Sequence, residues 1–379
     1  MAERIAERRA RRLQIRYRGR GAQVWIYLGK LLRMFIYQND WKVLPMAAVI
    51  AGLVGMVIRT RLFITMEGTM MGAFSLVMVC IWNGCFNSIQ VICRERDVIK
   101  REHRSGMHIS SYIRAHMMYQ AMLCLLQTAV TIYITMMIGV QYGGKGAVTS
   151  LMVLDFAISM FLITYASDMM SLWVSTLAKS TTTAMTIMPF VLIFQLVFSG
   201  GMLTLPDWTK SITPLTISNP GLKVLVAQGD YNSRPVMTVW NTVNGMKETK
   251  VSATVTLGQM MDFMQQKENE LVAEVRGKEL AEGLTVGDVL DQVMASPELQ
   301  AHREEGYTFN STVGAVMEMI GVDRVKDILQ NKIAESSRIA EYENTRQNVL
   351  GYWLRLFLFV IAFAALATIT LEFIDKDKR

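Results

Sequence analysis

The sequence has few of the residues that form disulfide bonds, ligate metals or catalyse hydrolysis. Among 379 residues there are four histidines, three of them between positions 103 and 116 and the fourth at position 302, so no Ser/His/Asp triad is expected. The four cysteines lie within or at the ends of two apolar segments, at Cys80, Cys85, Cys93 and Cys124. Their spacing indicates neither a metal site nor a disulfide framework for the polar part of the chain. We therefore predict no catalytic residue and no bound metal.

The sequence also lacks a phosphate-binding loop. No segment matches G-x-x-x-x-G-K followed by Ser or Thr, the pattern whose backbone amides and lysine hold nucleotide phosphates. The nearest glycine-lysine cluster, Gly143-Gly-Lys-Gly, has the wrong spacing. We therefore predict that this chain binds no ATP by that route, is not itself an enzyme and carries no cofactor.

Charged residues are scarce for a soluble protein. They make up 19% of the chain, against 51% hydrophobic residues, whereas soluble domains have roughly a quarter of their residues charged. Six segments reach the roughly 20 residues that a helix needs to cross a hydrocarbon core: 41–62, 69–93, 110–140, 147–177, 180–204 and 350–373. The sequence thus predicts an all-α integral membrane protein with six transmembrane helices and both termini on one side.

The charges that do occur are unevenly distributed. Residues 1–21 hold eight arginines against Glu3 and Glu7, which predicts a cytoplasmic arm that contacts anionic lipids or an acidic partner and no nucleic acid. Residues 205–348 hold 20 acidic and 14 basic residues. The inside-positive bias places this region outside the cell.

An amphipathic helix is predicted before the first span. Apolar residues at helical spacing run from Val24 to Ile36, while Lys30 and Arg33 lie on the other side. Polar residues and Pro45 interrupt the apolar run before the hydrocarbon begins, which favours a helix at 22–40 lying in the membrane interface. The alternative is an N-terminal extension of the first span.

Polar side chains inside the predicted spans have two interpretations each. Asn83, Asn87 and Gln90 follow one helical face of the second span, either as contacts between helices or as the lining of a wet cavity. Asp155 and Asp168 in the fourth span are about 20 Å apart along a helix and cannot form a catalytic pair. Either carboxylate could take part in proton coupling. Asp155 could instead pair with Arg114 or Arg355, or reach water.

The predicted external region contains a weak repeat. Thr256, Thr285 and Thr312 each begin a similar pattern, Thr-x-Gly followed by apolar residues at helical spacing. Threonine is suited to cap a helix, so three short amphipathic helices are predicted, which could stack into a helical external domain. The alternative is chance recurrence of a helix-start pattern.

A charge-dense run lies between the second and third predicted spans. From Arg94 to Gly106, eight of the first eleven residues are Lys, Arg, Asp or Glu, so the run cannot lie in hydrocarbon. Five of these residues are basic and three acidic, and connections with excess Lys and Arg stay on the cytoplasmic side. The run is therefore predicted to form a short loop at the cytoplasmic membrane face.

Two local patterns resemble the membrane half of ATP-binding-cassette exporters of the G subfamily, the white and pleiotropic-drug-resistance type. The first is Cys85-Phe86 followed by 95–107, with two glutamates seven residues apart and Ser-Gly after the second. The second is similar to that family's fifth span and re-entrant turn, and comprises Phe198-Ser-Gly-Gly-Met-Leu203, Pro206-Asp-Trp208, Ser218-Asn-Pro220 and Asp230-Tyr231. With the order of spans, the resemblance covers residues 22–234 and 350–373.

The patterns and the resemblance together divide the chain into five parts. These are a basic cytoplasmic arm (1–21), an amphipathic connecting helix (22–40), spans one to five with a coupling helix at 94–106 and a re-entrant turn at 205–220 (41–234), a helical external domain (235–346) and span six (350–373). The external region is longer than in the family and lacks the cysteines of its eukaryotic members, which suggests a bacterial protein.

The resemblance also implies site residues. A coupling helix would seat on an ATPase, through Glu95, Arg96, Asp97, Lys100, Arg101, Glu102 and Arg104. Two permease copies would enclose a substrate cavity, with Asn83, Phe86, Asn87, Phe190 and Phe194 as candidates. Met202 and Leu203 correspond to the apolar plug that separates the family's inner and outer cavities. For the cavity and plug residues, the alternative is ordinary packing between helices. For the charged run, the alternative is a solvated loop without a partner.

The expected function is that of an export permease in the cell membrane. It would move a hydrophobic or amphipathic compound, with ATP and Mg bound by a separate ATPase subunit, and act with a second permease copy among membrane lipids. The alternative is a mechanotransmission or signalling protein whose external domain binds an envelope partner without transport. A membrane enzyme is a weaker third interpretation.

Overall fold

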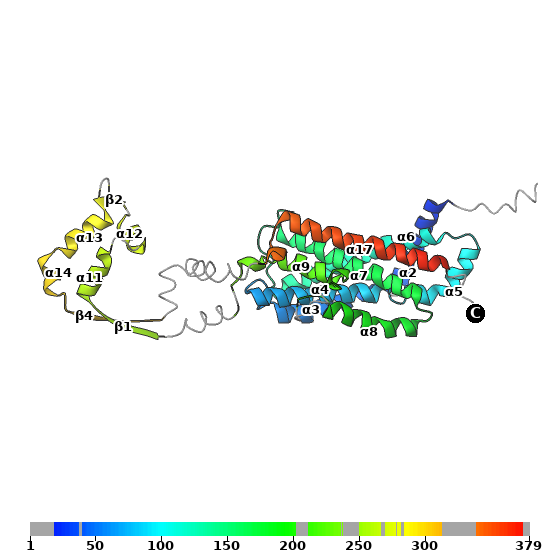
Figure 1. The fold of residues 1–379 in the computed structure, drawn as a ribbon, viewed down its shortest axis with the longest axis horizontal. Coiled ribbons are helices and arrows are strands. Elements are labelled where there is room, and N and C mark those ends of the chain that lie inside the picture. The colour runs from blue at the N-terminus through cyan, green and yellow to red at the C-terminus, as the bar shows by residue number, and fades with distance from the viewer. Residues whose placement is uncertain are drawn as a thin grey trace, which may run out of the picture. The chain divides into compact units, whose positions relative to one another are not determined.

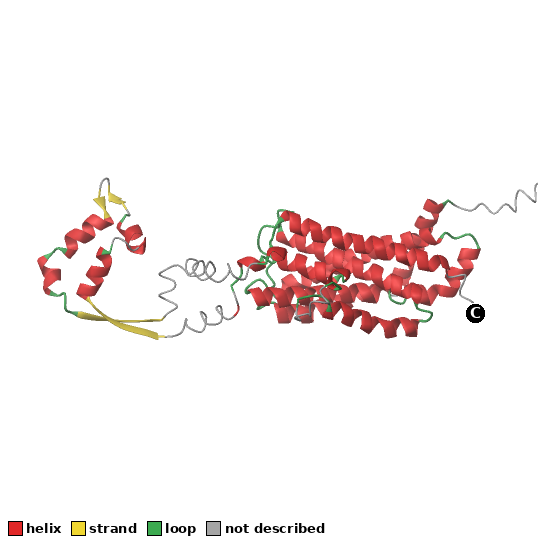
Figure 2. Ribbon diagram, viewed as in Figure 1, coloured by secondary structure: helices red, strands yellow, loops and turns green. Residues whose placement is uncertain are grey.

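The computed structural model describes residues 19–37, 40–201, 211–235, 237, 250–266, 270–277, 279–281, 284–312 and 339–373. The chain divides into two compact units. The larger unit, called the membrane unit, comprises Met1–Met237 and Lys332–Arg379. The smaller comprises Thr238–Asn331 and is called the external unit after the location that the sequence predicts for it. The described part of the membrane unit is built from helices joined by turns, whereas the external unit contains both helices and strands (Figure 2).

The helices of the membrane unit run side by side as a bundle (Figure 1). In chain order they are α2 (Arg20–Tyr37), η1 (Asp40–Lys42), α3 (Val43–Ile58), α4 (Met66–Ser88), α5 (Val91–Arg104), α6 (Ile109–Ile138), α7 (Met152–Leu177), α8 (Thr181–Val197), η3 (Thr213–Leu215), α9 (Ser218–Gln228), η4 (Tyr231–Ser233), η5 (Ala340–Tyr342) and α17 (Arg346–Glu372).

Each of the six predicted apolar segments forms a helix. Four helical segments are long and apolar enough to cross a membrane: α4 continued by α5 (Met66–Arg104), α6, α7 and α17. The helices α3 and α8, of 16 and 17 residues, are apolar but shorter. Described residues therefore contain four candidate membrane helices, two fewer than the sequence predicts.

The predicted fourth span begins later than expected because Asp155 folds the preceding loop. Its carboxylate accepts hydrogen bonds from the backbone N–H groups of Val148 and Thr149, each at 3.0 Å. Asp155 is fully buried. The side chain thus closes a turn at the start of α7, in place of the pairing with Arg114 or Arg355 that the sequence left open.

The helix α7 forms the centre of the bundle. It packs against α4, α6, α9 and α17. Small residues allow close approach: a Cβ atom on Gly84 of α4 would lie 2.3 Å from the carbonyl oxygen of Thr164 on α7. Ala47, Ala51 and Gly55 lie four residues apart on α3 and are buried, a spacing typical of close helix packing in membranes.

The helix α9 is buried along nearly its whole length. The side chain of Gln195 on α8 holds its first turn, because Oε1 accepts the backbone N–H groups of Ile217 and Ser218 at 3.0 and 3.1 Å. At the other end, Gln228 donates to the carbonyl oxygen of Asp155 at 3.2 Å. Residues 205–210 of the predicted turn lie outside the described residues.

The prediction that the external domain is helical was incomplete, because the external unit also contains strands. Its elements are β1 (Lys250–Thr256), α11 (Leu257–Gln265), α12 (Glu270–Arg276), β2 (Glu279–Ala281), β3 (Leu284–Thr285), α13 (Val286–Met294), α14 (Pro297–Ala301) and β4 (Gly306–Thr312). The strands β1 and β4 pair antiparallel, from Lys250 opposite Thr312 to Thr256 opposite Gly306. Both strands are rich in β-branched or aromatic residues, which suit a strand better than a helix.

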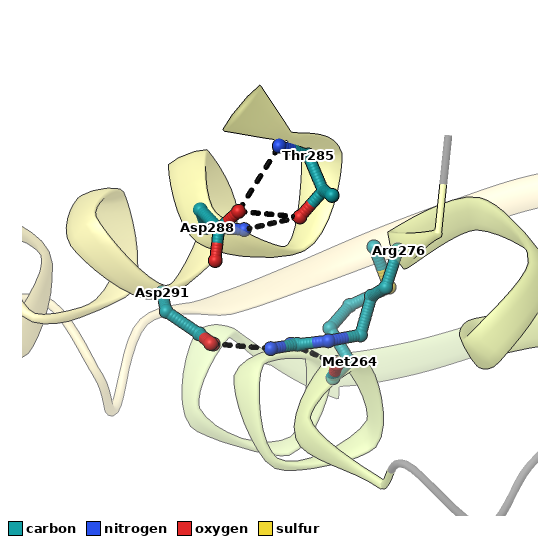
Figure 3. A network of polar contacts seen from close by, with 5 residues as sticks. All are labelled: Met264, Arg276, Thr285, Asp288 and Asp291. Carbon is teal, nitrogen blue, oxygen red and sulfur yellow. Dashed lines mark hydrogen bonds and ion pairs between the residues drawn. The ribbon is translucent and has the colours of Figure 1, made fainter. Parts of the chain in front are cut away.

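Two of the three predicted helix starts in the external unit are confirmed. Thr256 and Thr285 each cap a helix and form a capping box with the third residue of that helix. Thr312 instead ends β4, and the residues after it lie outside the described residues. Arg276 pairs with Asp291 and donates to the carbonyl oxygen of Met264 at 2.9 Å, which joins α12 to α13 and α11 (Figure 3).

Candidate functional site

The charged run forms the helix α5, which continues from α4 after only Ile89 and Gln90. The hydroxyl oxygen of Ser175 on α7 accepts the backbone N–H groups of Ile92 and Cys93 at 3.1 and 3.2 Å, so it satisfies donors in the first turn. The helix ends before Gly106, which adopts a φ of 101° that favours glycine. The run is therefore helical, where the charge pattern alone predicted a loop.

Glu95 and Glu102 both contact the helix α2. The carboxylate of Glu95 lies 3.5 Å from Nζ of Lys30 and accepts a hydrogen bond from the hydroxyl group of Tyr112 at 3.4 Å. Glu102, two turns further along α5, accepts a hydrogen bond from the hydroxyl group of Tyr27 at 2.9 Å. Burial raises the pKa of Tyr27, and the hydrogen bond and charge of Glu102 raise it further. The Tyr27 hydroxyl therefore stays protonated and donates.

Arg96 joins α5 to the end of α7. Its guanidinium donates to the carbonyl oxygens of Thr176 and Ala178 at 3.1 and 2.9 Å. These carbonyls lie where α7 ends at Leu177 and have no partner within that helix. Together with the Ser175 contact, these bonds fix α5 across the C-terminal end of α7.

Arg94 is exposed in the first turn of α5. The outward face of the helix is formed by Asp97, Arg101 and Arg104, which are also exposed. Their spacing of four and three residues places them on one side of the helix. Lys100 is half-buried. Arg101 and Arg104 also lie in the last turn, where positive charge is favourable beside the helix C-terminus. Of the seven predicted coupling residues, these three are the best placed for contact with another protein.

The sequence analysis missed the inner contacts of α2. Gln23 donates to the carbonyl oxygen of Gly106 at 3.2 Å and accepts from the backbone N–H group of His108 at 2.9 Å. With Tyr27 and Lys30 it forms a polar stripe, at spacings of four and three, that lies against α5 and the turn after it. The spacing of these three residues is visible in the sequence. Neighbouring residues, however, do not show whether such a polar stripe contacts another helix or faces solvent.

The five predicted cavity residues do not meet within one protomer. Phe190 and Phe194 on α8 are exposed and line a pocket of about 350 Å³ with residues of α7 and α17. Phe86 and Asn87 line a different pocket, of about 220 Å³, and Asn83 is buried. Phe86, 46% exposed, stacks on Trp82 with ring centroids 5.8 Å apart. The aromatic candidates are thus surface residues of the bundle.

Asn87 belongs to a buried polar network around Asp168. Its amide exchanges hydrogen bonds with the amide of Gln127 at 2.8 and 3.0 Å and donates to Asp168 at 3.4 Å. Ser88 also donates to Asp168, and Gln120 donates to Ser88 at 2.8 Å. The network joins α4, α6 and α7. Asn87 thus makes contacts between helices, and with Gln90 it also lines the pocket of about 220 Å³, so both interpretations of this polar line stay open. The network members other than Asn87 and Asp168 were not predicted.

The sequence pattern of the family described as ABC-2 type transporter matches residues 10–222, more than half of the chain. The chain belongs to this family. A 126-residue stretch is 30% identical to the ABC transporter ATP-binding/permease protein Rv1747 of Mycobacterium tuberculosis. That stretch is 32% of this chain and 14% of the relative, so the chain spans a small part of that protein's length.

The matched range of this ABC-2 transporter domain contains every predicted site residue. It runs through α2 and α5 and ends within α9, so the external unit and α17 lie beyond it. Met202 and Leu203 fall inside the matched range but outside the described residues, and their role stays a prediction.

Proposed function

We propose that this chain is the permease subunit of an ATP-driven exporter that moves a hydrophobic or amphipathic compound out of a bacterial cell. The ABC-2 family membership supports the transporter assignment. The sequence has no phosphate-binding loop, so ATP and Mg bind to a separate ATP-binding-cassette subunit. The similar Mycobacterium tuberculosis protein carries both ATP-binding and permease in its name, which supports this pairing of functions.

In this proposal the chain crosses the cell membrane six times, with both termini in the cytoplasm. The helices α3 and α8 join the four longer ones as spans. At 1.5 Å per residue they reach about 25 Å, slightly less than the roughly 30 Å of hydrocarbon, a difference that local thinning of the bilayer accommodates. The helix α2 lies in the interface, where the exposed side chains of Trp25 and Ile36 contact lipid.

The arrangement of α5 is the observation that carries the proposal. Its outward face presents Asp97, Arg101 and Arg104, while Glu95 and Glu102 contact α2 and Arg96 contacts the end of α7. A partner docked on the outward face therefore pulls on three helices at once: α4 through chain continuity, α2 and α7. A rigid element with such contacts converts movement of a docked domain into tilting of the spans.

The substrate cavity in this proposal lies between two permease copies. Trp82 and Phe86 on α4, and Phe190 and Phe194 on α8, expose aromatic surface that one protomer leaves uncovered. Aromatic and amide groups hold amphipathic molecules by stacking and hydrogen bonding. Asn83 and Asn87 supply the amides, and Met202 and Leu203 the gate.

Reconstitution with the partner ATPase tests this function. The chain is co-expressed with a candidate ATP-binding-cassette subunit from the same organism, and the purified complex is placed in vesicles. We expect a stable complex whose ATP hydrolysis rises with amphipathic compounds. A complex that forms but shows no compound-dependent hydrolysis contradicts export.

That result favours the alternative, in which the spans carry a signal and no substrate. The external unit supports this second candidate, since it is compact and carries its own capped helices and paired strands. In that case its partner in the envelope, and no small compound, changes the rate of hydrolysis.

A further inference from the structure

A pocket of about 220 Å³ lies under α2, between that helix, α3, the α4–α5 segment and α6. Leu31 and Met34 of α2 and Phe86 form part of an apolar wall, and polar side chains of α5 and α6 form the rest. None of Asp97, Arg101 and Arg104 lines it, and it is separate from the aromatic pocket on α8. It shares Phe86 and Asn87 with the proposed substrate cavity. Its volume is below the range of roughly 300 to 1,000 Å³ typical of sites that enclose a whole small ligand.

Two buried side chains in this pocket have unused hydrogen-bonding groups. His116 and Gln120 are each 1% exposed and lie one turn apart on α6. Within the part of the chain that the structure describes, neither ring nitrogen of His116 has a hydrogen-bond partner, nor does Oε1 of Gln120. Buried polar groups are nearly always satisfied, so unpaired groups lining a pocket point to a missing partner.

The unused groups specify the chemistry of that partner. A neutral histidine offers one donor and one acceptor, and the amide oxygen of Gln120 offers another acceptor. Hydroxyl groups match this set, because each both donates and accepts. An ammonium group would leave the histidine donor unpaired.

The charges of the pocket favour an anion. Arg94 lines it and is exposed, so it can reach a phosphate. Glu95, which also lines the pocket, already lies 3.5 Å from Nζ of Lys30. The apolar wall and the exposed Trp25 and Ile36 on α2 suit a molecule whose remaining part lies in lipid.

We infer that this pocket binds the glycerol phosphate headgroup of an anionic membrane lipid, with Arg94 on the phosphate and His116 and Gln120 on the hydroxyl groups. The acyl chains stay outside in the bilayer, which agrees with the small volume. This binding goes beyond the proposed export and does not depend on it.

Lipid binding is tested on the full chain in nanodiscs of phosphatidylcholine, with and without phosphatidylglycerol. Native mass spectrometry counts bound lipid, and thermal unfolding measures its stabilising effect. We expect wild type to retain phosphatidylglycerol and to unfold at a higher temperature when it is present. Equal retention and equal unfolding temperatures in the two bilayers overturn the inference and leave water as the occupant.

Variants locate the binding in this pocket. His116→Phe and Gln120→Leu each remove the unused groups and should weaken phosphatidylglycerol binding about tenfold, the effect of one or two hydrogen bonds. His116→Asn keeps a donor and an acceptor and should retain binding. The control His108→Phe changes an exposed histidine of the same region and should leave binding unchanged.

Three results overturn the inference. The first is undiminished binding in both His116→Phe and Gln120→Leu. The second is an unfolding temperature that His116→Phe raises equally in the two bilayers, as expected of an empty apolar pocket. The third is equal binding of free glycerol 3-phosphate, which would show that the lipid tail plays no part. If His116→Phe does not fold, Gln120→Leu and Arg94→Gln decide between the outcomes.

Discussion

The hydroxyl group of Tyr27 lies 2.9 Å from Oε2 of Glu102, a residue 75 positions further along the chain. Two turns earlier on α5, Glu95 lies 3.5 Å from Nζ of Lys30. Both contacts join α2 to α5. In the proposed mechanism these contacts pass a movement of α5 to α2, so substitutions at them separate docking on α5 from transmission.

Tyr27→Phe should weaken the joint between α2 and α5 without disturbing its packing. The ring keeps its edge contact with Tyr112, with centroids 5.6 Å apart, while the hydrogen bond to Glu102 is lost. We expect a loss of about 1 kcal/mol in unfolding free energy and less transport for each ATP hydrolysed. Thermal unfolding and vesicle transport measure the two effects. Tyr37→Phe, at an 82% exposed position, is the control and should change neither.

Glu102→Arg should uncouple ATP hydrolysis from transport. The substitution removes the acceptor for Tyr27 and replaces a negative charge facing α2 by a positive one, so the joint between α2 and α5 is weakened while the outward face of α5 keeps its residues. We expect ATP hydrolysis by the complex to continue while transport falls. Parallel assays of phosphate release and compound movement in the same vesicles measure this. An unchanged transport rate removes Glu102 from the coupling assignment.

Exchanging the charges of Lys30 and Glu95 tests their contact directly. Lys30→Glu or Glu95→Lys alone puts like charges together, whereas the double variant restores an opposite pair. Because Lys30 is 36% exposed, solvent screens the pair, and Lys30→Glu should cost less than about 1 kcal/mol in unfolding free energy. Glu95→Lys should cost more, because it also removes the acceptor of the buried Tyr112 hydroxyl group. A double-mutant cycle in low and high salt measures the coupling. Additive effects of the two changes at low salt would show that the contact contributes nothing.

The outward face of α5 should matter for assembly and not for stability. Asp97→Lys and Arg101→Glu alter exposed side chains, so each should change unfolding free energy by less than about 0.5 kcal/mol. We expect both to weaken co-purification with the ATPase subunit. Arg59→Glu, an exposed arginine directly after α3, is the matched control. Normal assembly of Asp97→Lys and Arg101→Glu would place the docking surface elsewhere.

Local patterns predicted the position of α5 but not its orientation. The charges of residues 94–106 were enough to place this segment at the membrane face, because a charged segment cannot lie in hydrocarbon. Which side of it faces outward depends on Gln23, Tyr27 and Lys30, residues about 75 positions earlier that sequence spacing alone cannot bring to it. The helix starts at Thr256 and Thr285 could be predicted because a capping box involves only residues within the first turn of the helix.

The other features that the sequence did not predict depend on contacts between residues far apart in the chain. The strand β1 pairs with β4, which lies some 50 residues away. No hairpin turn joins the two strands, so the sequence offered no local signal for the pairing. The network around Asp168 likewise combines three helices. Periodicity identified Asn83, Asn87 and Gln90 as one face of α4, but only the packing of α4 against α6 and α7 determined that Asn87 contacts Gln127 and Asp168.

Gln195→Leu should destabilise the membrane unit through α9. The side chain is 3% exposed, and its Oε1 accepts the backbone N–H groups of Ile217 and Ser218. Leucine fills a similar volume but leaves both donors buried without that acceptor, so we expect a loss of about 2 to 4 kcal/mol in unfolding free energy. Thermal unfolding of the reconstituted chain measures it, with Gln141→Leu at an exposed loop position as control. Equal unfolding temperatures for the two variants would mean that the start of α9 finds other acceptors, and that Gln195 does not hold this helix.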